Sequence, residues 1–318
     1  MKRNNLLSRR EILQSIGAGI VTSSLFPFRA IGGPSAPMLA ITIDDPNTKN
    51  TPILSATERD EKILETLKEY GIKAALFVCG KRVDSPEGSK LIELWDKAGH
   101  LICNHSYSHL YFHSSKIDLK VYIDDFLKAE KIIQTYKNFT KLFRFPYLKE
   151  GDTLEKRDGM RAFLKERGYT TGSVSLDASD WYIDDRMIAK LKENPKADTI
   201  LYKDFYLNHI WDRAQYYDEL AKKLTTYPVA HTILLHDTLL NALYLKDLIQ
   251  MFKGKGWQII DADKAFADSL YKKQPNILPA GESILWSLAK ESGKYETSLR
   301  YPGEDGDYEK PAMDKLGL

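Results

Sequence analysis

Two histidines spaced four residues apart, His105 and His109, are candidate ligands for a divalent cation. On one helical turn this spacing places both imidazoles on the same side. One carboxylate from the pair Asp44 and Asp45 would complete a set of two histidines and one acid, which leaves a coordination position open for water. His113 repeats the spacing after His109 and competes for the role, but it lies farther from the preceding apolar segment. The pattern favours metal-assisted hydrolysis.

The adjacent carboxylates Asp44 and Asp45 can divide two tasks between them. Successive side chains at the end of an extended strand point to opposite sides, so one carboxylate can bind the cation while the other faces its water. A water bound to a cation loses a proton more easily, and a nearby carboxylate can accept it. Each feature has an ordinary alternative, because paired histidines can be exposed or core residues and an acid pair before Pro46 is a common turn composition. Together, the two features favour the metal site.

Ligand-type and ionisable residues follow short apolar segments that have the character of strands. Residues 44–45, the segment 104–109 and the pair His236-Asp237 each follow such a segment, and Arg144 lies near the end of another. Parallel strands point the same way, so these residues should converge on one face. In parallel barrels that face holds the active site.

Short apolar runs alternate with longer segments of helical period, which is typical of parallel strands joined by crossover helices. This alternation predicts an α/β fold, a distorted parallel (β/α) barrel of about seven strands in a single catalytic domain, with an open doubly wound sheet as the alternative. The expected strands are 38–43, 74–78, 101–103, 142–145, 170–175, 232–235 and 257–260, and the expected helices are 57–70, 88–98, 118–136, 161–167, 216–224 and 241–252. The catalytic domain should span residues 37–270. The alternation is lost after Gln274, which predicts an irregular extension over residues 275–318.

Five segments, in this order, resemble the motifs of the NodB-homology polysaccharide deacetylases, also called carbohydrate esterase family four. They lie within residues 38–268 and comprise Thr42-Ile43-Asp44-Asp45, His105-Ser106-Tyr107-Ser108-His109, Arg144-Phe145-Pro146-Tyr147, Asp177-Ala178-Ser179-Asp180-Trp181 and Leu234-Leu235-His236. Each motif alone is only moderately specific, whereas the ordered set is strong. One departure is Pro46, where the family usually has glycine, and the segment 47–56 is longer than expected. This departure concerns the substrate groove rather than the chemistry.

The resemblance implies a role for each matched residue. Asp45, His105 and His109 would bind the cation, which is expected to be zinc, with cobalt or another first-row metal as alternatives. Asp44 would be the base, held in place by Arg144.

On the substrate side, the resemblance implies that His236 is the general acid and that Asp180 sets its protonation. The backbone N–H of Tyr147 would help hold the oxyanion, and Leu234 would line the acetyl pocket. Trp181 follows Asp180 directly, and an apolar ring there suits the wall of a pocket that takes a methyl group.

The expected activity is removal of N-acetyl groups from an acetylated amino-sugar polymer or oligosaccharide. Two other functions stay open, namely a deacylase acting on a non-sugar amide or an acetyl ester, and a glycan-binding module without turnover. The expected partner is an acetylated glycan, while the oligomeric state and the particular polymer are not indicated by the sequence.

The first thirty residues have the pattern of an export signal. Two arginines, Arg9 and Arg10, precede a weakly hydrophobic stretch, which resembles the twin-arginine type. We therefore expect a periplasmic or extracellular protein, whose only membrane association is through this segment and which stays anchored if the segment is retained. An amphipathic cytoplasmic helix is the alternative.

Net charge and cysteine content limit the possible partners and the possible role of the cysteines. Residues 1–30 hold five basic residues and one acidic residue, so the remaining chain, with 41 basic and 43 acidic side chains, is slightly acidic. No basic excess remains to neutralise a phosphate backbone, which makes nucleic acid a poor partner. The two cysteines, Cys79 and Cys103, lack zinc-finger spacing and can be either a disulfide or two buried thiols.

Overall fold

Strand β1 (Met38–Asp44) lies at the centre of the sheet in the computed structural model, which describes residues 36–300, 302–303 and 306–318. It pairs along its whole length with β7 (Ala230–His236). Its other edge is shared, because β8 (Gln258–Ile260) pairs with its first half and β2 (Ala75–Val78) with its second half. The predicted export signal lies outside the described residues.

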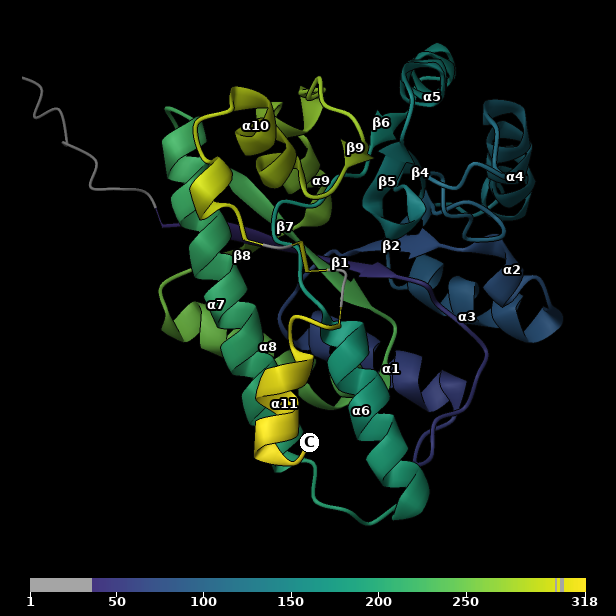
Figure 1. Cartoon of the computed structure of the whole chain (residues 1–318). Coiled ribbons are helices and arrows are strands. Elements are labelled where there is room, and N and C mark those ends of the chain that lie inside the picture. Colours follow the sequence, from purple (N-terminus) through teal and green to yellow (C-terminus); the bar gives the residue numbers. More distant parts are fainter. Residues whose placement is uncertain (1–35, 301, 304–305) are drawn as a thin grey trace, which may run out of the picture. The chain divides into compact units, whose positions relative to one another are not determined.

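The remaining strands continue the sheet outward from β2. They are β3 (Leu101–Asn104), β4 (Phe139–Phe143) and β6 (Thr170–Thr171), which gives the order β6-β4-β3-β2-β1-β7 with parallel pairing throughout. Beyond β6 the chain reaches β7, where Leu176 forms a parallel bridge with Ile233 and its carbonyl accepts a 3.0 Å hydrogen bond from the Leu234 N–H. This bridge brings the two ends of the sheet together. The predicted distorted parallel barrel of about seven strands is confirmed (Figure 1).

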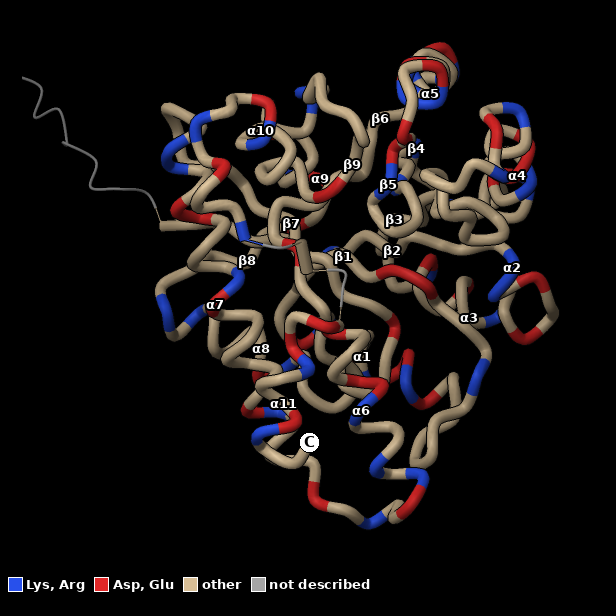
Figure 2. Tube along the Cα trace, in the orientation of Figure 1, with Lys and Arg blue, Asp and Glu red and all other residues tan. Residues whose placement is uncertain are grey.

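Helices cover the outside of this sheet (Figure 1). They are α1 (Ala56–Glu69), α2 (Gly80–Val83), α3 (Pro86–Lys97), α4 (Leu119–Ile133), α5 (Leu154–Glu166), α6 (Asp180–Glu193), α7 (Ile200–Leu224), α8 (Leu239–Gly254), α9 (Ala262–Phe266), α10 (Ile284–Ser292) and α11 (Lys310–Leu316). Acidic and basic residues are intermixed on outer helices such as α4 and α5 (Figure 2).

Local sequence signals explain where several helices begin. Ser55 and Glu58 form a capping box at α1, in which each side chain binds the other residue's backbone N–H. Asp118 caps α4 by accepting a 2.8 Å hydrogen bond from the Val121 N–H. Such caps satisfy backbone donors that have no partner inside the helix.

The buried strands explain why the apolar runs are nearly continuous. Leu39, Ala40, Ile41 and Ile43 of β1 are fully buried, because the sheet is covered on both faces. A separate aromatic cluster fills the space under α4 and α5, with Phe112 stacked on Tyr122 at 3.8 Å between ring centroids. Because the strands themselves are buried, residues that contact a substrate are expected at the ends of the strands.

Several helices before the tail differ from the sequence-based expectation. Helix α5 begins at Leu154 and α7 at Ile200, both well before the predicted starts, and α2, α6 and α9 were not predicted. The buried residues Tyr202, Tyr206 and Ile210 lie on one face of α7, but the first turn also exposes the apolar residues Ile200 and Leu201, so the sequence of its first half lacks a clean amphipathic period.

The prediction of an irregular extension after Gln274 is wrong for much of the tail. Helix α10 buries Leu285 and Ala289 and packs against α7, and the Ile284 N–H donates a 2.8 Å hydrogen bond to the carbonyl of Val174. A short strand, β9 (Ala280–Gly281), pairs antiparallel with β5 (Lys149–Gly151). The tail is thus part of the packed structure.

Both cysteines are free and buried, so the structure favours the two-thiol alternative. Burial raises the pKa of the Cys79 thiol to about 11, which keeps it protonated at neutral pH. Among the described helices, none is long and apolar enough to cross a membrane.

Candidate active site

The predicted site residues meet at the C-terminal edge of the sheet. Asp44 is the last residue of β1 and lies opposite His236, the last residue of β7. His105 directly follows β3, and Arg144 directly follows β4. The parallel pairing therefore places four chain segments around one cleft.

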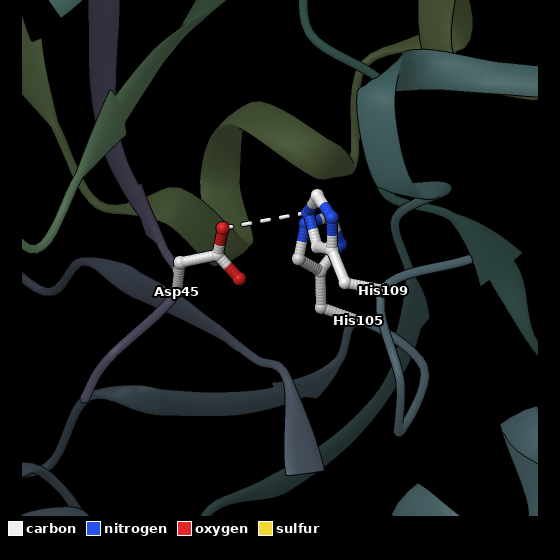
Figure 3. A group of neighbouring side chains, drawn as sticks. All are labelled: Asp45, His105 and His109. Atoms are coloured by element: carbon white, nitrogen blue, oxygen red, sulfur yellow. Dashed lines mark ion pairs between the residues drawn. The ribbon is translucent and has the colours of Figure 1, made fainter. Parts of the chain in front are cut away.

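Asp45, His105 and His109 form a candidate metal site (Figure 3). One ligand atom from each residue lies within 4.8 Å of the others. The Nε2 atom of His109 is 3.4 Å from Oδ2 of Asp45, and the two imidazole rings are 5.0 Å apart. His113 is not part of this group, since its Nε2–H donates a 2.8 Å hydrogen bond to the carbonyl of Ala280.

The chemistry of these three residues fits a cation. Oδ1 of Asp45 is buried without a hydrogen-bond partner, an arrangement that costs free energy unless a ligand satisfies it. Burial lowers the pKa of His105 to about 3, so its ring is neutral and keeps a lone pair. Its Nδ1 lies 2.8 Å from the carbonyl of Arg144 and must donate to it, which leaves Nε2 to bind the metal.

The backbone at the ligand segments is locally strained. Asp45, Ser106, His109 and Tyr147 all have φ between 55 and 62°, a left-handed region that residues other than glycine rarely adopt. Such conformations cluster at functional sites, where the surrounding structure holds them in place.

Asp125 of α4 holds the histidine loop and was not identified from the sequence. Its carboxylate accepts hydrogen bonds from the backbone N–H groups of Tyr107 and Ser108, at 3.0 and 2.9 Å. Within the loop, Ser106 Oγ accepts from the His109 N–H at 3.2 Å. These bonds fix the direction of both ligand side chains.

Asp44 is a buried carboxylate with a single strong cationic partner. Nη1 of Arg144 donates to its Oδ1 at 2.5 Å and to Oγ1 of Thr42 at 2.9 Å. The guanidinium lies 3.8 Å from the centre of the Phe77 ring, which holds it flat. Burial raises the pKa of Asp44 to about 6 even though Arg144 opposes the shift.

Whereas Asp44 is paired with a guanidinium, His236 is paired with a carboxylate. Its Nδ1 lies 2.7 Å from Oδ1 of Asp180, and the other oxygen of Asp180 accepts from the His236 N–H at 2.8 Å. Burial alone would lower the pKa of His236, but the carboxylates around it, Asp180 first and then Asp44 and Asp45, together outweigh burial and raise the pKa to about 9. Asn241 donates to Asp180 at 2.7 Å and accepts from the Tyr206 hydroxyl at 2.6 Å.

Asp44, Asp45, His105, His109 and His236 line a cleft of about 790 Å³. Trp181 and Leu234, the two residues predicted to line a pocket, lie in its wall together with the side chain of Tyr147. The long segment after Pro46 forms another wall together with α6, so the departure from the family pattern is part of the cleft.

An ion pair not predicted from the sequence anchors that segment. The guanidinium of Arg59 forks onto Asp237, with Nε 2.8 Å from Oδ1 and Nη2 2.6 Å from Oδ2. The same guanidinium donates to the backbone carbonyls of Asn47 and Lys49, at 2.5 and 2.8 Å. Asp237 follows His236, so one buried arginine links the cleft wall to the strand that carries the candidate acid.

Comparison with known proteins identifies the relationship. Residues 32–171 match the polysaccharide deacetylase family. This confirms the predicted resemblance, and the matched segment contains the first three of the five motifs. Two peptidoglycan-N-acetylglucosamine deacetylases of Bacillus cereus are similar, one 28% identical over 145 residues and the other 32% identical over 147 residues. Each alignment covers 45% of this chain, and the two cover 46% and 60% of the relatives, so the similarity spans about half of each relative.

Solved structures support the fold of the polysaccharide deacetylases over a larger part of the chain. A polysaccharide deacetylase from Bacillus cereus superposes with a TM-score of 0.50 at 21% identity, covering 71% of this chain and 91% of that one. A mutant of a pseudoenzyme of carbohydrate esterase family four gives the same TM-score at 19% identity, covering 74% of this chain and 68% of that one. Both likenesses concern the fold.

The candidate metal site predicts a selective effect of two histidine substitutions. His109→Ala removes one of three ligands and should weaken Zn²⁺ binding at least about 100-fold. His113→Ala is the matched control, because His113 lies outside the group, and it should bind as the wild type does. Titration calorimetry on chelator-treated protein measures both; equal affinities in the two variants would refute the site.

The Arg59–Asp237 pair predicts a loss of stability. Arg59→Met leaves a buried carboxylate unpaired and should lower the free energy of unfolding by about 3–5 kcal/mol. Adding Asp237→Asn removes that charge and should restore part of the loss. Lys246→Met, which breaks the exposed pair with Glu69, is the control and should cost less than about 1 kcal/mol. Urea unfolding measures the free energy of unfolding of each variant. A loss in Arg59→Met as small as that in Lys246→Met would contradict a stabilising role of the Arg59–Asp237 pair.

Proposed function

We propose that this protein is an exported, metal-dependent deacetylase that removes N-acetyl groups from an acetylated amino-sugar polymer. The observation that carries the proposal is the meeting, at one cleft, of a candidate cation site with a buried acid and a buried histidine whose pKa values are both raised, to about 6 and about 9. At neutral pH the carboxyl group is then ionised and the imidazole is protonated, which are the states that a general base and a general acid require.

Asp45, His105 and His109 would hold the cation, with zinc or another first-row metal fitting the nitrogen and carboxylate donors. A cation bound there supplies a Lewis acid that polarises the acetyl carbonyl and makes water easier to deprotonate.

Asp44 is assigned as the general base. Its carboxylate is ionised above about pH 6, and Arg144 fixes one oxygen so that the other can face the attacking water. The second oxygen, Oδ2, is 3.7 Å from Nε2 of His105, which places the base beside the candidate metal site. A positioned base of this kind contributes about 10²–10⁴-fold to a rate.

His236 is assigned as the general acid. With Nδ1 committed to Asp180, the proton to be donated resides on Nε2. A pKa of about 9 keeps the ring protonated at neutral pH, so a proton is ready for the departing amine. The amine is a poor leaving group without it.

The acetyl group is assigned to the corner formed by Tyr147, Trp181 and Leu234, which line the cleft together. In this assignment the backbone N–H of Tyr147 stabilises the oxyanion, a contribution worth on the order of 3 kcal/mol for a donor of this type. The left-handed backbone of Tyr147 supports this role, because it turns the peptide away from the regular strand direction.

The substrate and the location are part of the same proposal. The relatives are named as deacetylases of peptidoglycan N-acetylglucosamine, which supports a glycan containing that sugar as the substrate. Periplasmic or extracellular delivery by the twin-arginine-like segment would bring the enzyme to such a polymer. Action on a non-sugar amide or an acetyl ester is a distinct outcome of substrate screening.

The base and acid assignments predict large losses of turnover. Asp44→Asn keeps an acceptor for Arg144 but cannot take a proton, and His236→Ala removes the donor, so each should lower kcat about 10²–10⁴-fold. Acetate release from N-acetylglucosamine oligomers measures this, with circular dichroism and Zn²⁺ titration as controls for folding and metal binding. Turnover near the wild-type value in either folded variant would show the assignment to be wrong.

The shifted groups predict a bell-shaped dependence of kcat/KM on pH. Activity should rise as Asp44 loses its proton near pH 6 and fall as His236 loses its proton near pH 9. A bound cation would lower both pKa values, because it favours the ionised carboxylate of Asp44 and disfavours the protonated imidazole of His236. In the metal-loaded enzyme, the acidic limb of the pH profile should therefore lie at or below about pH 6 and the basic limb at or below about pH 9.

Asp180→Asn separates the two limbs. Because the Asp180 carboxylate raises the pKa of His236, its removal should move the basic limb to lower pH and leave the acidic limb in place. A basic limb that does not move would exclude His236 as the group titrating there.

A further inference from the structure

A second cleft of about 680 Å³ lies beside the candidate active site. The two clefts share Tyr147 and Trp181 in their walls, so they lie next to each other on either side of these aromatic side chains. A ligand held at Asp44 and His236 would reach the second cleft by passing these two side chains.

Aromatic rings lead from the candidate metal site into this second cleft. The His109 and Tyr147 rings are 4.5 Å apart between centroids, and the Tyr147 and Tyr111 rings are 5.5 Å apart. Tyr111 and Tyr147 are 46% and 45% exposed, which is unusual for large side chains of a closed core. Exposed aromatic surface in a concave site is typical of ligand binding.

The tail supplies the opposite wall. Trp286 of α10 lines the cleft, and its Nε1–H donates a 3.0 Å hydrogen bond to the carbonyl of Arg300, which fixes the indole. Glu282 follows β9 and forms a largely buried ion pair with Lys149 of β5, at the same cleft. The cleft thus combines aromatic faces with a charged, hydrogen-bonding edge.

We propose that this second cleft binds sugar units of the polymer that lie beyond the acetylated unit in the first cleft. The proposal rests on the function proposed above and deepens it. A pyranose ring has an apolar C–H face and a rim of hydroxyl groups, which match the aromatic rings and the Lys149–Glu282 edge respectively. The shared walls at Tyr147 and Trp181 place the occupant next to the first cleft, as a neighbouring unit of the same polymer would be.

The matched segment and the tail each supply one wall of this subsite. Tyr111 and Tyr147 lie within the segment that matches the family, whereas Trp286 and Glu282 lie beyond residue 171, where the match ends. The tail therefore completes a cleft that the matched segment forms only in part.

The experiment measures how kcat/KM depends on oligomer length. Oligomers of two and of six β-1,4-linked N-acetylglucosamine units are supplied to the metal-loaded full chain, and the ratio of the two kcat/KM values is compared among variants. Tyr111→Ala and Trp286→Ala should each lower the six-to-two ratio about three- to tenfold, the loss expected for one stacked ring.

Two controls separate stacking from other causes. Tyr111→Phe keeps the ring and should keep the ratio. Tyr308→Ala removes a tyrosine of similar exposure, 45%, that lines neither cleft, and should also keep it. A six-to-two ratio that stays at the wild-type value in both Tyr111→Ala and Trp286→Ala overturns the subsite.

Calorimetric titration distinguishes failure of the subsite from failure of the proposed function. If the metal-loaded wild type releases no acetate from either oligomer, the deacetylase proposal fails. The subsite is then decided by binding alone: tighter binding of the longer oligomer that Tyr111→Ala abolishes supports it, and equal affinities for the two oligomers refute it.

Discussion

The parallel pairing of β1 with β7 is the constraint on which the site depends. Seven consecutive residue pairs set the register, and the last of them places Asp44 opposite His236. A slip of one residue would turn every side chain of β1 to the other face and remove Asp44 from the cleft. Because β1 is buried on both sides by apolar residues, such a slip is strongly disfavoured. The core thus determines the distance between the candidate base and the candidate acid.

Burial has opposite consequences for these two groups because their partners differ. Both lose hydration, which disfavours the charged form. For Asp44 this desolvation prevails over Arg144, whereas for His236 the carboxylate of Asp180 prevails. Beside them, Oδ1 of Asp45 is buried and has no hydrogen-bond partner in the protein. The cleft therefore offers a position for a cation at Asp45, next to one group that can accept a proton, Asp44, and one that can donate a proton, His236.

The sequence could predict the strand ends, because apolar runs followed by ligand-type residues reveal both the sheet and the edge on which Asp45, His105 and His236 meet. It could not reveal partners brought together only by folding. Arg59 and Asp237 are 178 residues apart, and Asn241 reaches Asp180 across 61 residues. Helix α6 was not predicted, since its first residues, Asp180 and Trp181, were interpreted only through the roles that the motif implies. The tail helices were missed because several prolines and glycines interrupt the pattern there.

The tail also explains how a surface outside the family segment can influence the chemistry. Gly303 donates from its N–H to Asp177 at 2.9 Å, and an added Cβ there would lie 2.9 Å from the backbone of Ala178. This close approach ties the tail to the motif that carries Asp180 and Trp181. The Trp286 indole donates to the carbonyl of Arg300, three residues before Gly303, so a sugar unit held against Trp286 would lie close to this contact. Under the proposed function, the contact would connect the binding of distant sugar units to the motif that positions the candidate acid, His236, and so favour longer substrates at the reacting bond.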